Sequence, residues 1–555
     1  MSNLDPYLLS LVVFLPLFFV GILAFIPAQE HGPIRVLALL GLLADGAVSL
    51  WAWLRFQPAG PEFQLEHRAS FLELGGVSYH VGVDGLAISL VMLTALLGPV
   101  VVLASWRSVQ ERVKEFHLAL LVLQVFTMGA LVSLDLMLFY IFFEASLLPT
   151  GLLVGVWGGA LRNKASARYF LASFAGSVLM LVSLLAVYSV ALPVGQRTFD
   201  YALVSNTLQE AHRELAACRT PVAECGALSP LAQSVGTWGT WIFAGFALAF
   251  AVKSALFPVH RWLAETQSEA PRAASVLLAI KLGAFGFWRF GFPLFPDASQ
   301  QFRGLLTVLA VISIVYGALM CLAQRDIRRF LAYATISHLG SILLGMLTLT
   351  EEGATGSAYH MINQGLSTAA IFLLVGFLQE QRGSKQVQDY GGLARTMPRF
   401  AASFVLITFS LIGLPGTNGF VSEFLVLLGA FKSNLSPAVG ALAATGVVLS
   451  AAYMLWLVQK VLFGPVRHPE NQSLRDLHGR EWVMTIPFLV LVVVLGVKPQ
   501  PILDRLEPAS RRFVARSSVG MEGANPPAEL LRVTSSPLPE QASRELAPDF
   551  AHRVQ

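Results

Sequence analysis

Long apolar runs, separated by short polar segments, follow one another along almost the whole chain. Each run has roughly 18 to 25 residues, the length that a helix needs to cross about 30 Å of hydrocarbon. We count about fourteen runs, near residues 7–27, 34–54, 85–105, 117–134, 136–156, 169–192, 239–258, 271–291, 303–323, 330–349, 356–379, 402–428, 438–463 and 481–499. The strands of a membrane β-barrel would instead alternate apolar and polar residues over about ten positions. The pattern therefore predicts an all-α, polytopic membrane protein with about 14 transmembrane helices, whose backbone polar groups are satisfied within the helices.

Composition supports this fold class and excludes others. Apolar residues make up 55% of the 555 residues and charged residues only 13%, against about 25% charged residues in soluble domains. The mean hydropathy of +0.64 excludes a disordered chain, a coiled coil and an ordinary globular enzyme. The net charge of +4 is too small to predict a nucleic-acid partner. The three cysteines, Cys218, Cys225 and Cys321, are too few for a disulfide scaffold or an iron–sulfur cluster.

Basic residues predict the orientation in the membrane. They gather in the loops that follow odd-numbered runs, such as those with Arg107, Arg328 and Arg399. Positive loops face the cytoplasm, so both termini are expected to face outward, toward the periplasm of a bacterial inner (plasma) membrane. Asp5 and no basic residue precede the first run, which favours a membrane anchor over a cleaved signal peptide.

Two segments are predicted to lie outside the membrane. Residues 193–238 are expected to form an outward loop, in which Cys218 and Cys225 are either bonded to each other or remain two free thiols. Residues 500–555 are rich in Pro, Ser, Arg and Glu and contain no long apolar-periodic segment. We expect them to form an outward, largely disordered tail.

Five ionisable residues stand inside apolar runs on separate predicted helices: Glu144, Lys253, Lys281, His338 and Glu423. Each costs at least about 2.5–3.5 kcal/mol to insert, which makes such residues functional candidates. Each also has a structural interpretation. Glu144 and Lys253 are then a packing ion pair, and Lys281 is a lysine that extends to an interface. In the same interpretation His338 is a core histidine, and Glu423 bonds freed backbone amides. Five such costs in one membrane domain favour a common cause, namely a set of sites that hold protons.

Helix-breaking residues lie beside two of these five. Pro258 follows Lys253 in the seventh run, and Pro415, Gly416 and Gly419 precede Glu423 in the twelfth. Interrupted helices at corresponding places in two halves are typical of inverted-repeat transporters. We therefore predict two inverted five-helix repeats with discontinuous helices. The predicted divisions are 1–105 (transmembrane helices 1–3), 117–291 (first repeat), 303–463 (second repeat), 481–499 (last transmembrane helix) and 500–555 (tail).

Several strings in this order carry a resemblance to a known family. They span about residues 79–465 and include YHVGVDGLAISL (79–90), LDLMLFYIFFEASLLP (134–149), GVWGG (155–159), FAVKSALFPVHRWL (250–263), SEAPRAASVLLA (268–279), KLGAFGFWRF (281–290), QRDIRRFLAYATISHLG (324–340), DYGGLA (389–394) and LIGLPGTNGFVSEF (411–424). With them the chain resembles the antiporter-like membrane subunits of respiratory complex I, the NADH:quinone oxidoreductase, most closely the M type (chain 4 in mitochondria). The absence of a long amphipathic segment after residue 499 favours the M type over the L type.

The resemblance implies roles for the five residues. Glu144 and Lys253 would be the paired acid and base of a first half-channel, Lys281 and His338 would belong to a central polar axis, and Glu423 would end a second half-channel. The chain would be a proton-translocating subunit without a redox centre, since flavin and iron–sulfur clusters are expected in partner subunits. Its partners would be the lipid bilayer, L-type and N-type antiporter-like chains and small membrane chains.

The chain departs from the family pattern at several places. The family usually has His where Gln267 stands and Lys where Arg328 stands, and it often has His where Gln364 stands. The stretch from Glu269 to Lys281 is about three residues shorter than in the family, which removes most of a helical turn.

Other functions fit the same buried charges. They are a subunit of a multi-subunit cation/proton (Na⁺/H⁺) antiporter, the membrane arm of a hydrogenase or formate-linked complex, and a purely structural membrane scaffold.

Overall fold

The structure, a computed structural model, describes residues 5–72, 75–191, 197–218, 228–271, 274–466, 468–521 and 527–533. Within these ranges, twelve predicted runs form helices that are long and apolar enough to cross a membrane. They are α1 (Leu8–Phe25), α2 (His31–Arg55), α3 (Gly85–Ser108), α4 (Val113–Val132), α5 (Leu136–Ala145) continued by α6 (Leu147–Trp157), α7 (Arg162–Val190), α9 (Pro230–Lys253), α13 (Pro296–Ala323), α14 (Ile327–Leu347), α15 (Glu351–Arg382), α19 (Pro437–Val461) and α20 (Arg480–Val497).

The other two predicted runs are interrupted, so the count of about fourteen spans is not confirmed. The eighth run divides into η3 (Ala274–Ala279), α11 (Leu282–Gly286), the π-helical turn η4 (Phe287–Gly291) and α12 (Phe292–Leu294). The twelfth divides into α17 (Pro398–Leu411) and α18 (Asn418–Lys432). Between these last two helices, Gly413 and Gly416 have φ angles of 68° and 90°, a backbone conformation that favours glycine.

The interruption predicted in the seventh run is confirmed. α9 ends at Lys253, and the chain becomes helical again only in α10 (Arg261–Glu269). The indole Nε1 of Trp262 donates a 2.8 Å hydrogen bond to the carbonyl of Val252 in the last turn of α9, which also accepts one of 3.0 Å from the amide of Ala255. The amide of Phe257 donates to the Ser313 hydroxyl of α13 at 3.0 Å. Neighbouring helices thus satisfy the backbone groups that the break releases, as an irregular segment at membrane depth requires.

Aspartate residues cap the N-termini of several of these helices. Asp84 accepts a 2.8 Å hydrogen bond from the amide of Ala87 at the start of α3, and Asp135 accepts one of 3.0 Å from Leu138 in α5. Asp326 caps α14 in the same way. Each side chain pairs an amide that the first helical turn leaves unbonded, which explains why an acidic residue directly precedes an apolar run.

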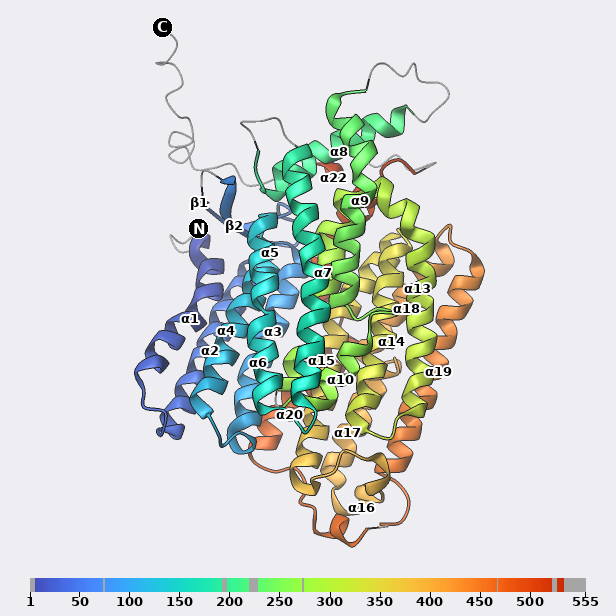
Figure 1. The fold of residues 1–555 in the computed structure, drawn as a ribbon. Helices are drawn as coiled ribbons and strands as arrows, with labels where there is room; N and C mark the ends of the chain where they lie inside the picture. Colours follow the sequence, from blue (N-terminus) through green and yellow to red (C-terminus); the bar gives the residue numbers. More distant parts are fainter. Residues whose placement is uncertain are drawn as a thin grey trace.

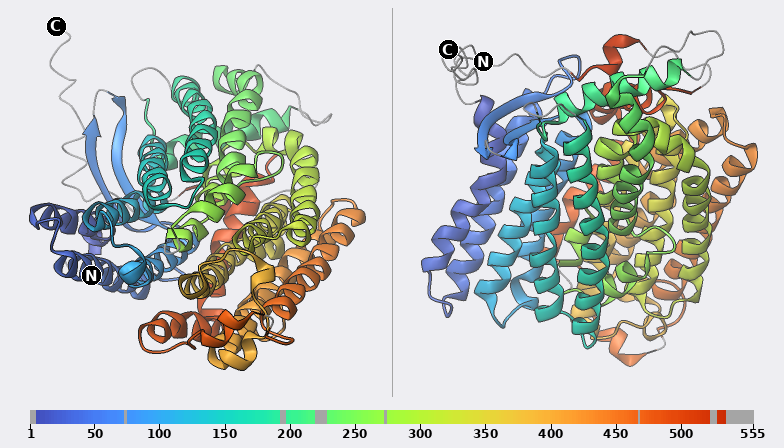
Figure 2. Two further views of the ribbon diagram at one scale, coloured as in Figure 1. Left: turned by 60° about the horizontal axis from the view of Figure 1, so that its bottom comes forward. Right: turned by 45° about the horizontal axis from the view of Figure 1, so that its top comes forward.

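The helices stand side by side as a bundle with two different ends (Figures 1 and 2). One end carries the N-terminus, an antiparallel hairpin of β1 (Gln64–Leu72) and β2 (Val77–Val83), α8 (Tyr201–Ala217) and α22 (Ala528–Leu531). The other end carries α16 (Leu393–Thr396) and the short helix η6 (Pro469–Ser473). α15 runs through the middle and packs against α14, α18, α20 and α21 (Gln500–Ser517).

The predicted outward loop 193–238 contains more helix than expected. α8 begins at Tyr201, after the N-cap residue Asp200, and α9 already begins at Pro230. Cys218 is disulfide-bonded, whereas Cys225 lies outside the described residues.

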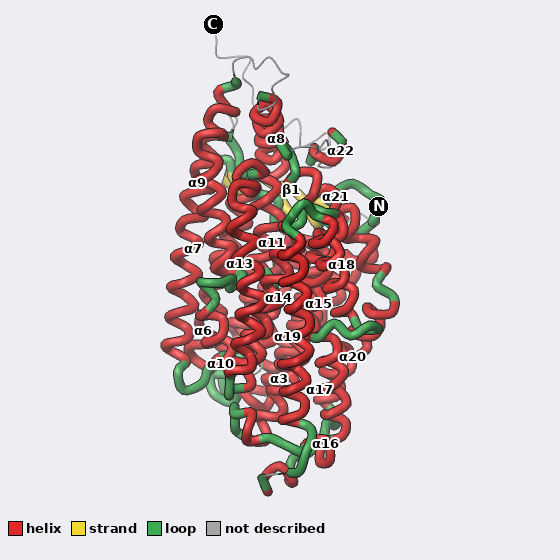
Figure 3. The backbone as a smooth tube through the Cα atoms, turned by 90° about the vertical axis from the view of Figure 1, so that its right-hand side faces the viewer, coloured by secondary structure: helices red, strands yellow, loops and turns green. Residues whose placement is uncertain are grey.

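The prediction of a disordered tail is wrong for its first part. Gln500–Ser517 form the helix α21, which packs against α15 and α3 at the same end as α8, α22 and β1 (Figure 3). Its many charged residues and Pro508 suggested disorder, but Ile502, Leu506, Ala509 and Phe513 recur at helical spacing and are buried. Residues 534–555 of the predicted tail lie outside the described residues.

Two buried contacts of Phe513 and Arg516 help to hold α21 against the rest of the molecule. The ring of Phe513 stacks on Trp288, with centroids 4.3 Å apart and planes 7° apart. The Arg516 guanidinium donates two hydrogen bonds of 2.6 Å to the two carboxylate oxygens of Glu62. Both side chains of this ion pair are nearly inaccessible, at 3% and 6% exposed, so loss of either partner would leave a buried charge.

A buried charged network joins the hairpin to α8. The His80 imidazole lies 2.8 Å from Asp200 and 3.1 Å from Glu66, and Arg68 lies 3.5 Å from Asp200. Burial disfavours the charged imidazole, but the hydrogen bonds and charges of Asp200 and Glu66 outweigh burial and raise the pKa of His80 to about 9.

Replacing Phe513 by Ala should loosen α21, because it removes the stacked ring and leaves a cavity at a cost of about 3–5 kcal/mol. Limited proteolysis of the protein in membranes should then release a C-terminal fragment several-fold faster. Arg511→Ala is the control, since the Arg511 side chain is 56% exposed. Equal protection of α21 in the two variants would mean that the Phe513 stack does not fix the helix.

The His80 network should make stability depend on pH. The folded pKa of His80 lies above the unfolded value of about 6.5, so its contribution is complete below about pH 6.5 and is lost as the pH rises through about 9. The melting temperature of the purified protein should therefore fall between pH 7 and pH 9.5, and His80→Gln should flatten this decline. A variant with the unchanged slope would contradict the assignment; replacement of the exposed His478 is the control.

Candidate functional site

The five predicted residues lie mainly where helices end or break. Lys253 is the last residue of α9, Lys281 directly precedes α11, and Glu144 is next to last in α5. Glu423 lies in the first part of α18, after the break that follows α17, and His338 lies in the middle of α14. Helix interruptions leave room between side chains that a continuous bundle would fill.

Lys253 and Glu144 are neighbours that do not touch. The Lys253 ammonium lies 3.4 Å from the Ser146 hydroxyl, at the junction of α5 and α6, and 4.9 Å from the centre of the Phe143 ring. Its charge interacts with the Glu144 carboxylate, but the two form no ion pair among the described contacts. One oxygen of Glu144, Oε2, has no hydrogen-bond partner in the described part of the chain. The pair is therefore electrostatically coupled without being fixed by a direct contact.

A cavity of about 80 Å³ connects Lys253 with Lys281. Besides the two amines, polar groups of Ser146, Thr150 and Tyr169 line it. A water molecule needs roughly 10–15 Å³ of such space and two or more polar partners, so the cavity has room for several waters. Lys281 is only 5% exposed, which argues against the interpretation that its amine extends to an interface.

His338 and Glu423 form the other end of this row. Lys281 is close enough to His338 to interact with it electrostatically, and His338 Nδ1 lies 3.7 Å from a carboxylate oxygen of Glu423. The structure thus brings all five predicted residues together in sequence: Glu144, Lys253, Lys281, His338 and Glu423.

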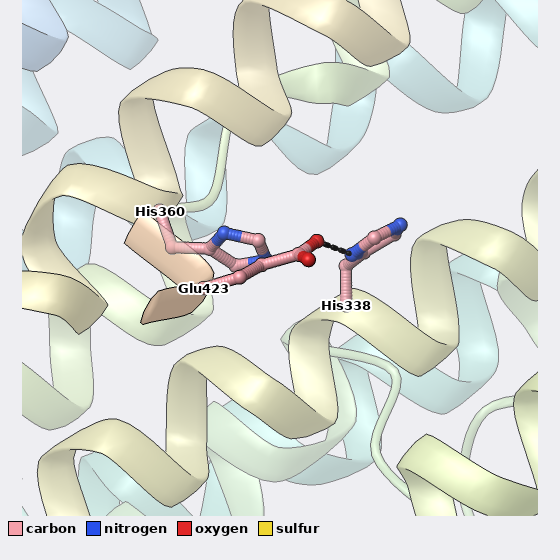
Figure 4. A group of neighbouring side chains, drawn as sticks. All are labelled: His338, His360 and Glu423. Atoms are coloured by element: carbon pink, nitrogen blue, oxygen red, sulfur yellow. Dashed lines mark ion pairs between the residues drawn. The ribbon is translucent and has the colours of Figure 1, made fainter. Parts of the chain in front are cut away.

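His360 belongs to the same row and was not predicted. It comes from α15, and the Glu423 carboxylate lies between its ring and that of His338 (Figure 4). The sequence contained a signal: an imidazole in the apolar run 356–379, one helical turn before Gln364, where the family often has His. Residues four apart share a helix face, so His360 occupies the face on which the family's histidine was expected.

A row of buried polar side chains leads away from His360 along α15. Ser422 lies 2.8 Å from His360 Nδ1, and Asn363 Nδ2 donates to the carbonyl of Asn418 at 2.7 Å. The Ser410 hydroxyl then donates to Asn418 Oδ1 at 2.6 Å, and Ser367 bonds Ser410. This row ends at the break between α17 and α18.

Two of the departures from the family pattern have a structural account. Arg328 donates a 2.8 Å hydrogen bond to the carbonyl of Ala270 and another to the Ser275 hydroxyl, so its charge sits at the C-terminus of α10, where a cation is favourable. Gln267 is fully buried, and both polar atoms of its amide lack partners among the described residues. A buried polar group in that condition marks a place for water.

Comparisons with known proteins show which family the chain resembles. Residues 133–450 match the family described as NADH:quinone oxidoreductase/Mrp antiporter, TM, and residues 63–130 match the amino terminus of NADH-ubiquinone oxidoreductase chain 4. NADH-quinone oxidoreductase subunit M of Rhodobacter capsulatus is 37% identical over 519 residues, covering 91% of this chain and 96% of that protein. The same subunit of Rickettsia prowazekii is 35% identical over 507 residues, covering 90% and 97%.

Solved structures give the same result. A chain in respiratory complex I from Thermus thermophilus with bound NADH superposes with a TM-score of 0.79 at 32% identity, covering 92% of this chain and 99% of that one. A chain in the Mrp complex from Dietzia sp. DQ12-45-1b superposes with a TM-score of 0.77 over 96% of this chain and all of that one, but at 20% identity, which shows a shared fold alone.

Replacing Gln267 by His should be tolerated, because the substitution breaks no hydrogen bond among the described residues and puts one polar group in place of another. The amount of folded protein in membranes should stay within about twofold of wild type. Gln209→His is the matched control: this buried amide donates a 2.5 Å hydrogen bond to the carbonyl of Pro293, so its loss should reduce the yield. Loss of folded protein in Gln267→His would show that its site has no room for an imidazole.

Proposed function

This chain belongs to the family of M subunits of NADH-quinone oxidoreductase, and from that premise we propose that it translocates protons across the bacterial inner membrane. The proposed path runs from Glu144 through Lys253, Lys281 and His338 to Glu423, with His360 as a further proton-binding residue (each such residue is called a station below). The observation that carries the proposal is the continuity of this row: each member is linked to the next by a charge interaction, a shared cavity or a close contact.

The first step concerns Glu144 and Lys253. A nearby carboxylate favours the charged form of an amine. Because no direct ion pair joins the two groups, a change of charge beside Glu144 can weaken the stabilisation of the Lys253 ammonium without breaking a strong bond. The Lys253 ammonium then loses its proton to water in the cavity of about 80 Å³ that it shares with Lys281.

The second step carries the proton from Lys281 to the imidazoles and the carboxylate. Lys281 interacts with both His338 and His360, so protonation of one group disfavours protonation of the others. Such groups titrate as a set, and a proton on one group lowers the proton affinity of its neighbours. A second proton that arrives at Lys281 therefore favours release of the first from the far end of the row. Glu423, 11% exposed and next to a helix break, is the exit from this row.

The energy for this movement has to come from outside the chain. Moving one charge across the membrane takes about 2.3 kcal/mol per 100 mV. We propose that flavin and iron–sulfur clusters in partner subunits supply it and that this chain holds no redox group. The partners would be L-type and N-type antiporter-like chains and small membrane chains of the membrane arm, with both termini of this chain facing outward.

Replacing Lys253 by Met, or Glu144 by Gln, tests the proposal. Met keeps the length of the side chain without a proton-binding group, so NADH-driven proton pumping in vesicles should fall by at least about tenfold, and coupled NADH:quinone reduction with it. Assembly, measured by flavin content and by the size of the purified complex, should be unchanged.

Lys432→Met is the matched control, because the Lys432 ammonium is 53% exposed and its ion-pair partner among the described residues is the partly exposed Glu352. Normal pumping in a fully assembled Lys253→Met variant would rule out this lysine as a station. Sodium/proton exchange in vesicles, with no flavin-containing partner attached, would instead support the antiporter function.

A further inference from the structure

Three side chains of metal-binding type meet where α14, α15 and α18 come together. His338, His360 and Glu423 each offer a ligand atom, and these atoms lie within 4.8 Å of one another. The Glu423 carboxylate lies between the two imidazole rings in Figure 4. The cavity that all three line has a volume of about 20 Å³, the space of roughly one water molecule.

Hydrogen bonding determines which nitrogen of His360 faces the cavity with a free lone pair. The Ser422 hydroxyl has one proton and donates it to the carbonyl of Gly419 at 2.8 Å. Its oxygen, 2.8 Å from His360 Nδ1, is therefore the acceptor of the Nδ1 proton. The neutral ring then carries no proton on Nε2, the nitrogen nearer Glu423 in Figure 4.

Several buried acceptor atoms of this cluster have no hydrogen-bond partner within the described part of the chain. Among the described residues, His360 Nε2 and Glu423 Oε2 have no hydrogen-bond partner. His360 is 2% and His338 5% exposed, so bulk water does not reach the rings. A buried polar atom without a partner is costly, and an electrophile between these atoms would satisfy them.

We propose that His338, His360 and Glu423 bind one Zn²⁺ ion and that its binding blocks the last proton station. The ligands are His338 Nδ1, His360 Nε2 and a Glu423 oxygen, with one position left for water. The metal site stands on the geometry of the cluster alone, whereas the blocking effect rests on the proposed function.

The chemistry of the three ligands selects zinc. Two imidazoles and a carboxylate suit Zn²⁺, whereas Mg²⁺ and Ca²⁺ prefer oxygen ligands. Zinc–ligand bonds of about 2.0–2.2 Å in a tetrahedron put the ligand atoms about 3.4 Å apart. The side chains would therefore move together by roughly 0.7 Å each from their present 4.8 Å limit. Ser422 supplies the outer hydrogen bond that typically orients a zinc-bound imidazole.

The same lone pairs hold either the metal or a proton. Zinc binds deprotonated carboxylate and neutral imidazole, so any proton on these groups is released when the ion binds. While the ion stays, neither Glu423 nor the imidazoles can accept a proton from Lys281.

Zinc content of the purified complex tests the site without turnover. The complex is stripped with chelator, incubated with Zn²⁺, freed of unbound metal, and its zinc is counted by mass spectrometry relative to flavin. Wild type should retain about one zinc more than His360→Gln, and Ser422→Ala should bind that ion about 10- to 100-fold more weakly. His117→Gln, which removes a buried imidazole of α4 outside the cluster, should retain the wild-type count.

Equal zinc counts in wild type and assembled His360→Gln would overturn the site. If His360→Gln does not assemble, His338→Gln gives the same comparison. Lys253→Met should keep the additional zinc although it stops pumping, so failure of the site and failure of the proposed function are separate results.

Inhibition tests the consequence of binding. In vesicles, the Zn²⁺ concentration that halves NADH-driven pumping, relative to each variant's own zinc-free rate, should be at least about tenfold higher in Ser422→Ala than in His117→Gln. Equal midpoints, together with the expected zinc counts, would show that the bound ion does not block the path.

Discussion

Hydrocarbon around the bundle leaves backbone amides and carbonyls no partner except other parts of the protein, and this constraint organises the rest of the structure. A helix can stop at membrane depth only where its neighbours take up the freed groups. α9 stops at Lys253 because Trp262 and Ser313 bond the chain around the break. At the break before α18, the Thr417 hydroxyl donates to the carbonyl of Leu414, and Asn363 of α15 donates to the carbonyl of Asn418. Ionisable side chains lie beside these breaks because the same neighbours that satisfy the backbone also shield charge from lipid.

The two halves of the polar row are built in different ways. Around Lys253 and Lys281 there are few direct hydrogen bonds and a cavity of about 80 Å³. The protein positions the two amines there, and water in the cavity has to connect them. Around Glu423 the cavity is about 20 Å³, and the imidazole of His360 is held by Ser422. The first half tolerates small displacements, whereas the second depends on the orientation of particular rings and hydroxyls. Outer hydrogen bonds are therefore more important at the Glu423 end.

Hydrophobic periodicity predicted most of the fold because apolar length alone decides whether a helix can cross the membrane. It failed where that criterion does not apply. α21 lies at the end of the bundle, and its four buried residues were obscured by the charges and Pro508 around them. The run 271–291 is long and apolar, but its glycines pack against α9, where an added Cβ at Gly286 would lie 2.3 Å from the Phe250 ring, and the helix divides. The cost of burying charge singled out the two lysines and the two glutamates, whereas an imidazole can be buried neutral and gives a weaker signal, so His338 was predicted and His360 was missed.

The ion pair between Glu62 and Arg516 has a consequence for biosynthesis. The two residues are 454 positions apart, so Glu62 leaves the ribosome long before its partner exists. At about 5–20 residues per second, the carboxylate waits roughly 20 to 90 seconds. Glu62 lies in the connection between α2 and β1, outside the helices of the bundle, so its carboxylate need not enter the hydrocarbon during that interval. Synthesis of α21 then supplies Arg516, so one of the last helices to be made completes a contact with a residue among the first hundred.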